Sequence, residues 1–451
     1  MTNLKRDINL FEATIFTLGV IIGAGIYVLV GKAAGFSGNG VWLSFLLASL
    51  IAACTGLSYA ELSSTYPYDS AEYLYTWKAF KDRKFSFGIG WLKLAGLTIG
   101  MGAVALGFGG YLNRLLGLHP ILGGLLLIAV LMVLNLTGIK STMMIDIGFV
   151  LLTIAGLVVI IFVGAKHIGS VDAFDLEFGW GGVMTGAALI FFAFLGFENI
   201  GNIGEETKDP RKTLPRSLII SIVVSTLLYT LVALVAVNVV PWKQLAASSA
   251  PLADVMHAML GSNGALFIII IALAATASTV LGLFVASSRL LFGMAEEGSM
   301  PKALMRISKR SGAPFIAIIA SAVIGIIFVI PGDITTVASL TDWAALFVFL
   351  IVNLTCIWLR FKDPNAIRGF RIPGSIARVP VIPVIGIIFC GVMMFHFSKK
   401  LWLAGIVFFL VGLVLYSMFW EKRHKPLEHH ERTVHHMKHY VAHKPQSHKK
   451  R

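Results

Sequence analysis

The chain has 451 residues, of which 57% are hydrophobic and only 13% are charged, and its mean hydropathy is +0.83. This composition excludes an ordinary soluble globular protein and predicts an all-α polytopic membrane protein. The net charge of +14 follows the loops and the tail, as membrane topology requires, so we expect no nucleic-acid partner. Cys54, Cys356 and Cys390 lie in apolar segments, which predicts buried thiols rather than disulfides or a metal site.

The apolar runs predict twelve transmembrane helices embedded in a lipid bilayer. Their approximate bounds are 11–34, 40–65, 85–113, 120–138, 143–165, 183–204, 216–240, 264–292, 314–331, 337–360, 380–397 and 400–420. Most lysines and arginines fall on the side of the N-terminus, and the opposite side holds Lys32, Arg114, Lys166, Lys243, Lys399 and Lys400. The positive-inside rule therefore predicts a multi-pass protein of the cytoplasmic membrane with both termini in the cytoplasm.

The first span is organised around a glycine cluster. Gly23, Ala24 and Gly25 lie at the middle of residues 11–35, where glycine permits a non-helical backbone. Inside a membrane such a break is tolerated where it lines a protected cavity, and broken helices of this kind form the substrate sites of secondary transporters. A small-residue face for close helix packing is the alternative interpretation.

The sixth span has a comparable interruption. Gly196, Glu198 and Asn199 lie deep inside the apolar run 183–204. An ionisable side chain at that depth is costly and indicates a functional site, although a neutral Glu198 bonded to a neighbouring helix is the structural alternative.

Other charges in the spans carry weaker signals. Lys93 is two turns from the cytoplasmic end of its span, so we expect it to extend to the interface, and Asp146 lies similarly near an inner end. The loop 66–84 predicts a short helix on the inner face, and Pro215 suits the first turn of the seventh span.

Spans 1 and 6 are each the first of five spans, and five spans place the two units in opposite orientations. This pattern is typical of an inverted repeat with a site between the two broken helices. The predicted organisation is a cytoplasmic segment 1–10, a first repeat 11–165, a second repeat 183–360, two further helices in 380–420 and a tail 421–451. The tail is basic and rich in histidine, with few apolar residues, which predicts disorder.

Five motifs in this order resemble the amino acid–polyamine–organocation transporters, a superfamily that includes amino acid permeases and cationic amino acid transporters. They are GVIIGAGIY (19–27), YAELSSTYPYDSAEYLYTWKAF (59–80), FFAFLGFENIGNIGEETKDPRKTLPR (191–216), ASSRLLFGMAEEGSMPKAL (286–304) and LRFKDPNAIRGFRIPG (359–374). The resemblance implies the fold of the leucine transporter, with ten helices in a 5+5 inverted repeat, helices 1 and 6 broken, and two extra C-terminal helices.

The resemblance also implies residue roles. The substrate carboxylate would meet Ile22, Gly23, Ala24, Gly25 and Ile26, and the amino group would meet carbonyls around Phe191, Ala193 and Phe194. Leu195, Gly196 and Glu198 would lie beside the substrate side chain.

The chain departs from proton-coupled members of that superfamily, where a lysine of the fifth span stands in for a sodium ion. The matching position here is Thr153, and the surrounding oxygens belong to Gly19, Ile22, Ser278 and Thr279. A sodium ion suits such oxygens, and a proton on Glu198 or exchange without an ion stays open.

The sequence therefore predicts a secondary active transporter that moves L-amino acids by alternating access, as a symporter or an exchanger. A channel, a transporter-like sensor, or a carrier of polyamines or cationic amino acids stays open as an alternative. The spans hold no intramembrane histidine pair, HExxH or GxSxG sequence, so we expect no enzyme, no catalytic residue, no bound metal and no cofactor besides a coupling Na+ or H+. The oligomeric state is not predicted.

Overall fold

A computed structural model describes residues 6–248, 250–330, 334–395 and 397–419. The basic tail 421–451 and the start of segment 1–10 lie outside these residues, so the predicted disorder of the tail stays a prediction.

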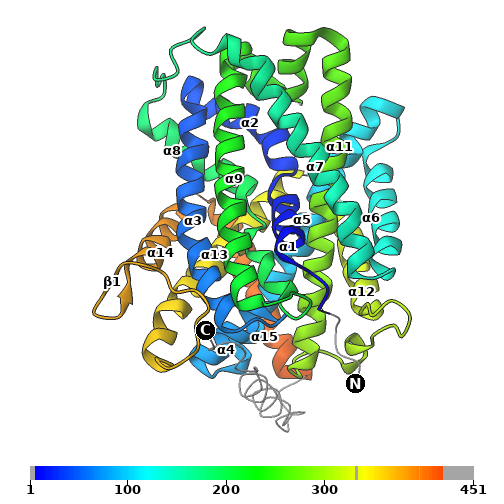
Figure 1. The fold of residues 1–451 in the computed structure, drawn as a ribbon, viewed down its shortest axis with the longest axis vertical. Helices are drawn as coiled ribbons and strands as arrows, with labels where there is room; N and C mark the ends of the chain where they lie inside the picture. The colour runs from blue at the N-terminus through cyan, green and yellow to red at the C-terminus, as the bar shows by residue number, and fades with distance from the viewer. Residues whose placement is uncertain (1–5, 249, 331–333, 396, 420–451) are drawn as a thin grey trace, which may run out of the picture.

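The described chain is a bundle of long helices (Figure 1). The α-helices are α1 (Leu10–Ile21), α2 (Ala24–Ser37), α3 (Val41–Thr65), α4 (Ala71–Phe80), α5 (Arg83–Leu116), α6 (Pro120–Leu136), α7 (Ile139–Gly164), α8 (Gly179–Ile190), α9 (Pro210–Val239), α10 (Trp242–Ala247), α11 (Pro251–Glu296), α12 (Phe315–Val329), α13 (Ile334–Lys362), α14 (Val381–Met394) and α15 (Lys399–Phe419). The 3-10 helices are η1 (Gly38–Gly40), η2 (Ala165–His167), η3 (Phe191–Phe194), η4 (Phe197–Ile203) and η5 (Lys302–Met305). A small antiparallel hairpin pairs β1 (Ser375–Ile376) with β2 (Val379–Pro380).

Nine segments of the described chain are long and apolar enough to cross a membrane. The helices α6, α12 and α14 are apolar but shorter. Large apolar side chains such as Leu126, Met144, Leu227 and Val323 face outward, as expected where the solvent is lipid. The chain is therefore built as a multi-pass membrane protein.

The centre of the bundle is α5. The apolar window of α5 is 94% buried, against 17% for that of α15, so α5 runs through the interior while α15 lies at the periphery. It packs against α6, α11 and α13, and α3 packs along α9. Below, the end of the bundle that carries α4 is called the α4 end, and the opposite end, which carries α10, is called the α10 end.

Both predicted interruptions are present. The helix α1 ends at Ile21 and α2 begins at Ala24, on the same line through the bundle (Figure 1). After α8, the chain passes through η3, turns at Gly196 and continues in η4. The first break lies at Ile22 and Gly23, so Ala24 and Gly25 already belong to the second half-helix.

Some of the local predictions from the sequence are confirmed and one is wrong. The loop 66–84 contains the expected short helix, α4, and all three cysteines are buried and unpaired. The prediction for Pro215 was wrong: α9 begins at Pro210, directly after Asp209, and Pro215 lies inside the helix. A proline at N1 satisfies the same start signal five residues earlier.

The eighth predicted span begins close to where the sequence placed it. The helix α11 consists of two helical parts that meet at Gly261, whose φ of 69° is not helical, and the long second part follows that residue. That backbone conformation is open to glycine and costly for other residues.

Candidate functional site

The carbonyl groups freed at the end of α1 are held by two other helices. The Thr279 hydroxyl of α11 donates to the Gly19 carbonyl at 3.0 Å and lies 3.4 Å from the Val20 carbonyl. The Tyr229 hydroxyl of α9 donates to the Ile21 carbonyl at 2.7 Å. A helix end inside a membrane needs such partners, because no water satisfies its carbonyls. The break is therefore a built feature of the bundle.

On the other side of the break, α2 starts with its amides turned toward the gap. Ile22 caps α1 with non-helical angles (φ −82°, ψ 78°), and Gly23 precedes the first residue of α2, Ala24. Gly23 occupies the N-cap and has no side chain that could satisfy the first amides, which belong to Ala24, Gly25 and Ile26. Free amides and the helix dipole favour an anion at this position.

The two glycines at this break are also required by packing. A Cβ atom on Gly23 would overlap the Thr279 hydroxyl, and a Cβ atom on Gly25 would overlap Ala193 of η3. Both interpretations of the glycine cluster in the sequence therefore hold at once, since it interrupts the helix and lets neighbouring segments approach closely.

The second break turns at Gly196. Its φ of 123° suits glycine, and a Cβ atom there would approach Val20 to 2.6 Å. The Gly196 amide donates to Glu198 Oε2 at 2.8 Å, so the carboxylate folds back over its own turn. The two breaks meet at this point, because Val20 belongs to α1 and Gly196 follows η3.

A cavity lies between the breaks and α5. Its lining is mostly apolar and comprises Val20, Ile21, Gly23, Gly25, Leu92, Lys93, Gly96, Leu97, Gly100, Val104, Phe192, Leu195, Gly196, Glu198, Thr279, Leu283, Thr341 and Ala345. A concave, largely apolar pocket with a few polar groups is the usual form of a small-molecule site.

Several residues expected at the site line this cavity, and others lie behind it. Those that line it are Gly23, Gly25, Leu195, Gly196, Glu198 and Thr279. The rings of Phe191 and Phe194 pack instead against Phe349 and Tyr229, with ring centroids 6.1 Å and 5.2 Å apart. Phe192, which the sequence did not single out, lines the cavity in their place.

The expectation for Lys93 was wrong. Its side chain is 5% exposed and does not reach the surface; Nζ lies 2.8 Å from Glu198 Oε1. Distance along a helix from its end does not reveal which face a lysine occupies, and here the face points to the second break. Glu198 is thus bonded through both oxygens, to Lys93 and to the Gly196 amide.

A second carboxylate stands beside this pair. Glu72 of α4 places Oε1 3.5 Å from Lys93 Nζ and accepts a hydrogen bond from the Tyr59 hydroxyl at 3.0 Å. Burial raises the pKa of the Glu72 carboxyl, whereas the Lys93 ammonium opposes that rise. Lys93 therefore connects the cavity to the short helix at the α4 end.

Comparison with known proteins shows the family of the chain. Residues 8–420 match the family model described as amino acid permease. The chain belongs to the amino acid permease family. It is 31% identical to the branched-chain amino acid permease BcaP of Bacillus subtilis, over 94% of this chain and 95% of that protein. It is 30% identical to the methylthioribose transporter of the same organism, over 93% and 94%. It is also 30% identical to the mitochondrial cationic amino acid transporter 3 of Arabidopsis thaliana, over 77% and 61%.

In this permease, the oxygen cluster expected for a cation contains one carboxylate more than the sequence indicated. Ser278 donates to Asp146 Oδ1 at 2.6 Å, and a Cβ atom on Gly19 would lie 3.1 Å from Asp146 Oδ2. Asp146 therefore lies beside the end of α1. Thr153 is buried on the same helix and donates to the Phe149 carbonyl at 2.8 Å, within its own backbone.

The position of Asp146 could have been found from spacing. It precedes Thr153 by seven residues, which is two helical turns, so both side chains occupy one face of α7.

Buried charged side chains gather at the α4 end of the permease. Arg289 of α11 is fully buried and contacts Glu206 through Nε at 3.0 Å. Beside it, the Glu205 amide donates to Asp69 Oδ1 at 3.0 Å. Burial raises the pKa of Glu205 to about 7 and that of Asp69 well above its usual value. The segment before α1 joins this layer, since the Ile8 amide donates to the Glu206 carbonyl at 3.0 Å.

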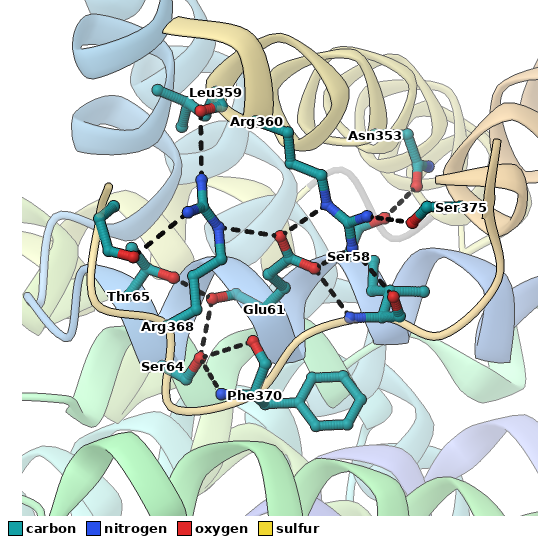
Figure 2. Close-up of polar contacts among 12 residues, drawn as sticks. Ser58, Glu61, Ser64, Thr65, Asn353, Leu359, Arg360, Arg368, Phe370 and Ser375 are labelled. Atoms are coloured by element: carbon teal, nitrogen blue, oxygen red, sulfur yellow. Dashed lines mark hydrogen bonds and ion pairs between the residues drawn. The ribbon is translucent and has the colours of Figure 1, made fainter. Parts of the chain in front are cut away.

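A second network of charged side chains, centred on Glu61, joins α13 to α3 (Figure 2). Glu61 of α3 lies between two arginines, accepting from Arg360 Nε at 2.9 Å and Arg368 Nε at 3.2 Å. The Ile372 amide donates to Glu61 Oε2 at 2.9 Å, so the chain after α13 folds back over α3. These hydrogen bonds and ion pairs offset the cost of removing the Glu61 carboxylate from water.

Proposed function

We propose that this permease is a secondary active transporter that carries an L-amino acid across the cytoplasmic membrane by alternating access. The observation that carries the proposal is the cavity bounded by both helix breaks, with the start of α2, which no side chain caps, at one break and the non-helical turn at Gly196 at the other. Membership of the amino acid permease family supports it.

In the proposed binding mode, the amides at the start of α2 bind the substrate carboxylate. Carbonyls of η3, at Phe191, Ala193 and Phe194, bind the amino group. A zwitterion suits this arrangement because Gly25, near the positive end of α2, and Phe192 of η3 both line the cavity. Its side chain then extends toward α5, past Leu195 and Gly196.

The proposal includes twelve spans arranged as two inverted repeats. The first repeat would comprise α1 with α2, then α3, α5, α6 and α7. The second would comprise α8 with η3 and η4, then α9, α11, α12 and α13, and α14 and α15 would follow. Each unit opens with an interrupted helix, which supports the assignment. The basic loops around α4 and after α13 support a cytoplasmic α4 end.

Alternating access requires the α4 end to open and close. We infer that the contacts of Arg289 with Glu206 and of Glu61 with Arg360 hold this end closed. These are ion pairs between separate segments of the chain, so helix movement can break and remake them.

For the coupling cation, we place the site at Gly19, Asp146, Ser278 and Thr279 rather than at Glu198. The Gly19 carbonyl, two hydroxyls and a carboxylate form a set of hard oxygen ligands suited to Na+, and Asp146 alone suits a proton. Glu198 is the weaker candidate because both of its oxygens are already bonded.

Counterflow in proteoliposomes tests the function. Vesicles loaded with one unlabelled amino acid at a time should accumulate the same labelled amino acid, and at least one of the twenty should give this result. Binding without accumulation would indicate a sensor. Stabilisation by methylthioribose but by no amino acid would contradict the proposed carboxylate site, because that sugar has no carboxylate.

A further inference from the structure

Two charges that contact each other line the cavity. Among the described residues that line it, Lys93 on α5 and Glu198 after the second break are the ones with ionisable charges. The other lining side chains near them are apolar, among them Leu92, Leu97 and Leu195. The pair is therefore the part of the cavity that can respond to charge on a substrate.

Glu198 receives its counter-ion from the protein. Its Oε1 lies 2.8 Å from the Lys93 ammonium and its Oε2 accepts the Gly196 amide at 2.8 Å. Both side chains are 5% exposed, so neither has bulk solvent as an alternative partner. A buried carboxylate without a partner is costly, whereas a paired and hydrogen-bonded one is tolerated.

Lys93 is itself held in this position. Glu72 approaches its ammonium to 3.5 Å from α4, and the Tyr59 hydroxyl fixes the Glu72 carboxyl through a 3.0 Å hydrogen bond. Lys93 lines the cavity from α5, so its ammonium occupies the space next to Glu198 that a ligand's cationic end would need.

We propose that Lys93 determines the charge of the substrate: it is a tethered counter-ion that takes the place of a cationic side chain beside Glu198 and restricts the site to amino acids with neutral side chains. This inference rests on the proposed function, because it concerns the side chain of an amino acid bound between the two breaks. A neutral apolar side chain packs against the leucines of the cavity. The ammonium of lysine or ornithine meets Lys93 instead, and like charges in a buried site repel.

The test compares norleucine with lysine. These ligands share a four-carbon side chain and differ by the terminal ammonium. For the wild type in detergent or nanodiscs, we expect norleucine to displace a bound labelled amino acid at a concentration at least a hundredfold lower than lysine. In Lys93→Met, which keeps the unbranched stem and removes the charge, the preference for norleucine should fall at least tenfold, because the ligand ammonium now pairs with Glu198.

Two further variants separate charge from shape. In Lys93→Met/Glu198→Gln the carboxylate that lines the cavity is also neutral, whereas Glu72, which is outside the lining, is kept, so most of the gain in lysine binding should disappear. Lys309→Met removes an exposed lysine far from the cavity and should keep the wild-type preference. Unchanged preference in Lys93→Met, or an equal gain in the double variant, would overturn the inference.

The wild-type measurement stands without any variant. Equal affinity of the wild type for norleucine and lysine would also overturn the role of Lys93, even if Lys93→Met did not fold. The absence of binding by every amino acid would instead overturn the proposed function itself, so the two failures are distinguishable.

Discussion

The hydroxyl of Thr279 on α11 donates a hydrogen bond to the carbonyl of Gly19 at the end of α1, across 3.0 Å. This contact ties the first helix break to a residue that lies 260 positions later in the chain. It also explains Gly23, because a Cβ atom at that position would occupy the space of the same hydroxyl. The break and its support are thus one structural unit.

Thr279→Val should weaken that unit. Valine keeps the shape of threonine but leaves the buried Gly19 carbonyl without its donor, which costs about 1–3 kcal/mol. We expect a lower melting temperature and weaker amino acid binding. Thr279→Ser retains the hydroxyl and should melt closer to the wild type. Equal melting temperatures for the valine and serine variants would show that the hydrogen bond does not support the break.

Glu61→Gln should loosen the closure at the α4 end. Two arginines would then share a neutral amide, and one of them, Arg360, is buried. Breaking a buried ion pair costs roughly 3–5 kcal/mol, and we expect the free energy of unfolding to fall by a large part of that amount. Cys356, which is 1% exposed on α13, should react faster with N-ethylmaleimide in a background where Cys54 and Cys390 are serine. Asp209→Asn removes an exposed carboxylate and is the control. An unchanged Cys356 rate in Glu61→Gln would argue against a closing role for this network.

Part of the site follows from local sequence, because a glycine cluster at the middle of a span, or a glycine beside a carboxylate deep in an apolar run, indicates a break, whereas the single glycines of α5 lie in a continuous helix. Gly23, Gly196 and Glu198 could be singled out on that basis. The partners of these residues could not, since Lys93 and Thr279 approach them from helices distant in sequence. For Lys93 the sequence predicted the membrane interface, because its position along the helix indicates its depth in the membrane. The direction in which its side chain points depends on packing with α4 and η4, which the sequence does not reveal.

The limits of the helices could also be predicted only in part from the sequence. The sequence placed Pro215 in the first turn of the seventh span, but α9 starts at Pro210. Pro210 begins the helix because Asp209 adopts a positive φ of 45° and turns the chain. The pairing of Glu61 with Arg360 was not visible from the sequence, since it depends on α3 and α13 lying side by side (Figure 2).

The closure around Glu205 should depend on pH. Burial raises the pKa of this carboxyl to about 7, the Asp69 amide lowers it, Glu206 and Glu297 raise it, and Arg6 lowers it. An acid whose pKa is higher in the folded state stabilises that state below its unfolded pKa, near 4.5, and loses this contribution as pH rises through about 7. The melting temperature should therefore fall between pH 5 and pH 8. Glu205→Gln should make this dependence shallower, and an identical slope in the variant would assign it to other groups such as Asp69.

Asp146→Asn tests the proposed coupling site. The amide keeps a bond with Ser278 but carries neither charge nor an exchangeable acid proton. If sodium couples transport, sodium-dependent uptake should fall at least tenfold while exchange of substrate across the membrane continues. If a proton couples transport, the uptake of the variant should depend less on pH than that of the wild type. Wild-type dependence on both ions in Asp146→Asn would remove this carboxylate from coupling, and Glu198→Gln would become the variant to measure.

The proposed function requires an amino acid to bind in the cavity between the two breaks, and α5 offers a matched pair of glycines to test this binding. A Cβ atom on Gly96, which lines the cavity, meets its nearest neighbour, the Ala344 Cβ, at 3.8 Å, whereas Gly107 has open space around it. The decisive measurement is the rise in melting temperature that a bound amino acid produces in wild type, Gly96→Leu and Gly107→Leu, since binding to the folded state stabilises it. We expect a clear rise for the wild type and Gly107→Leu and none for Gly96→Leu, because the leucine side chain fills the cavity. A rise as large as that of the wild type in folded Gly96→Leu would show that the amino acid does not bind in this cavity.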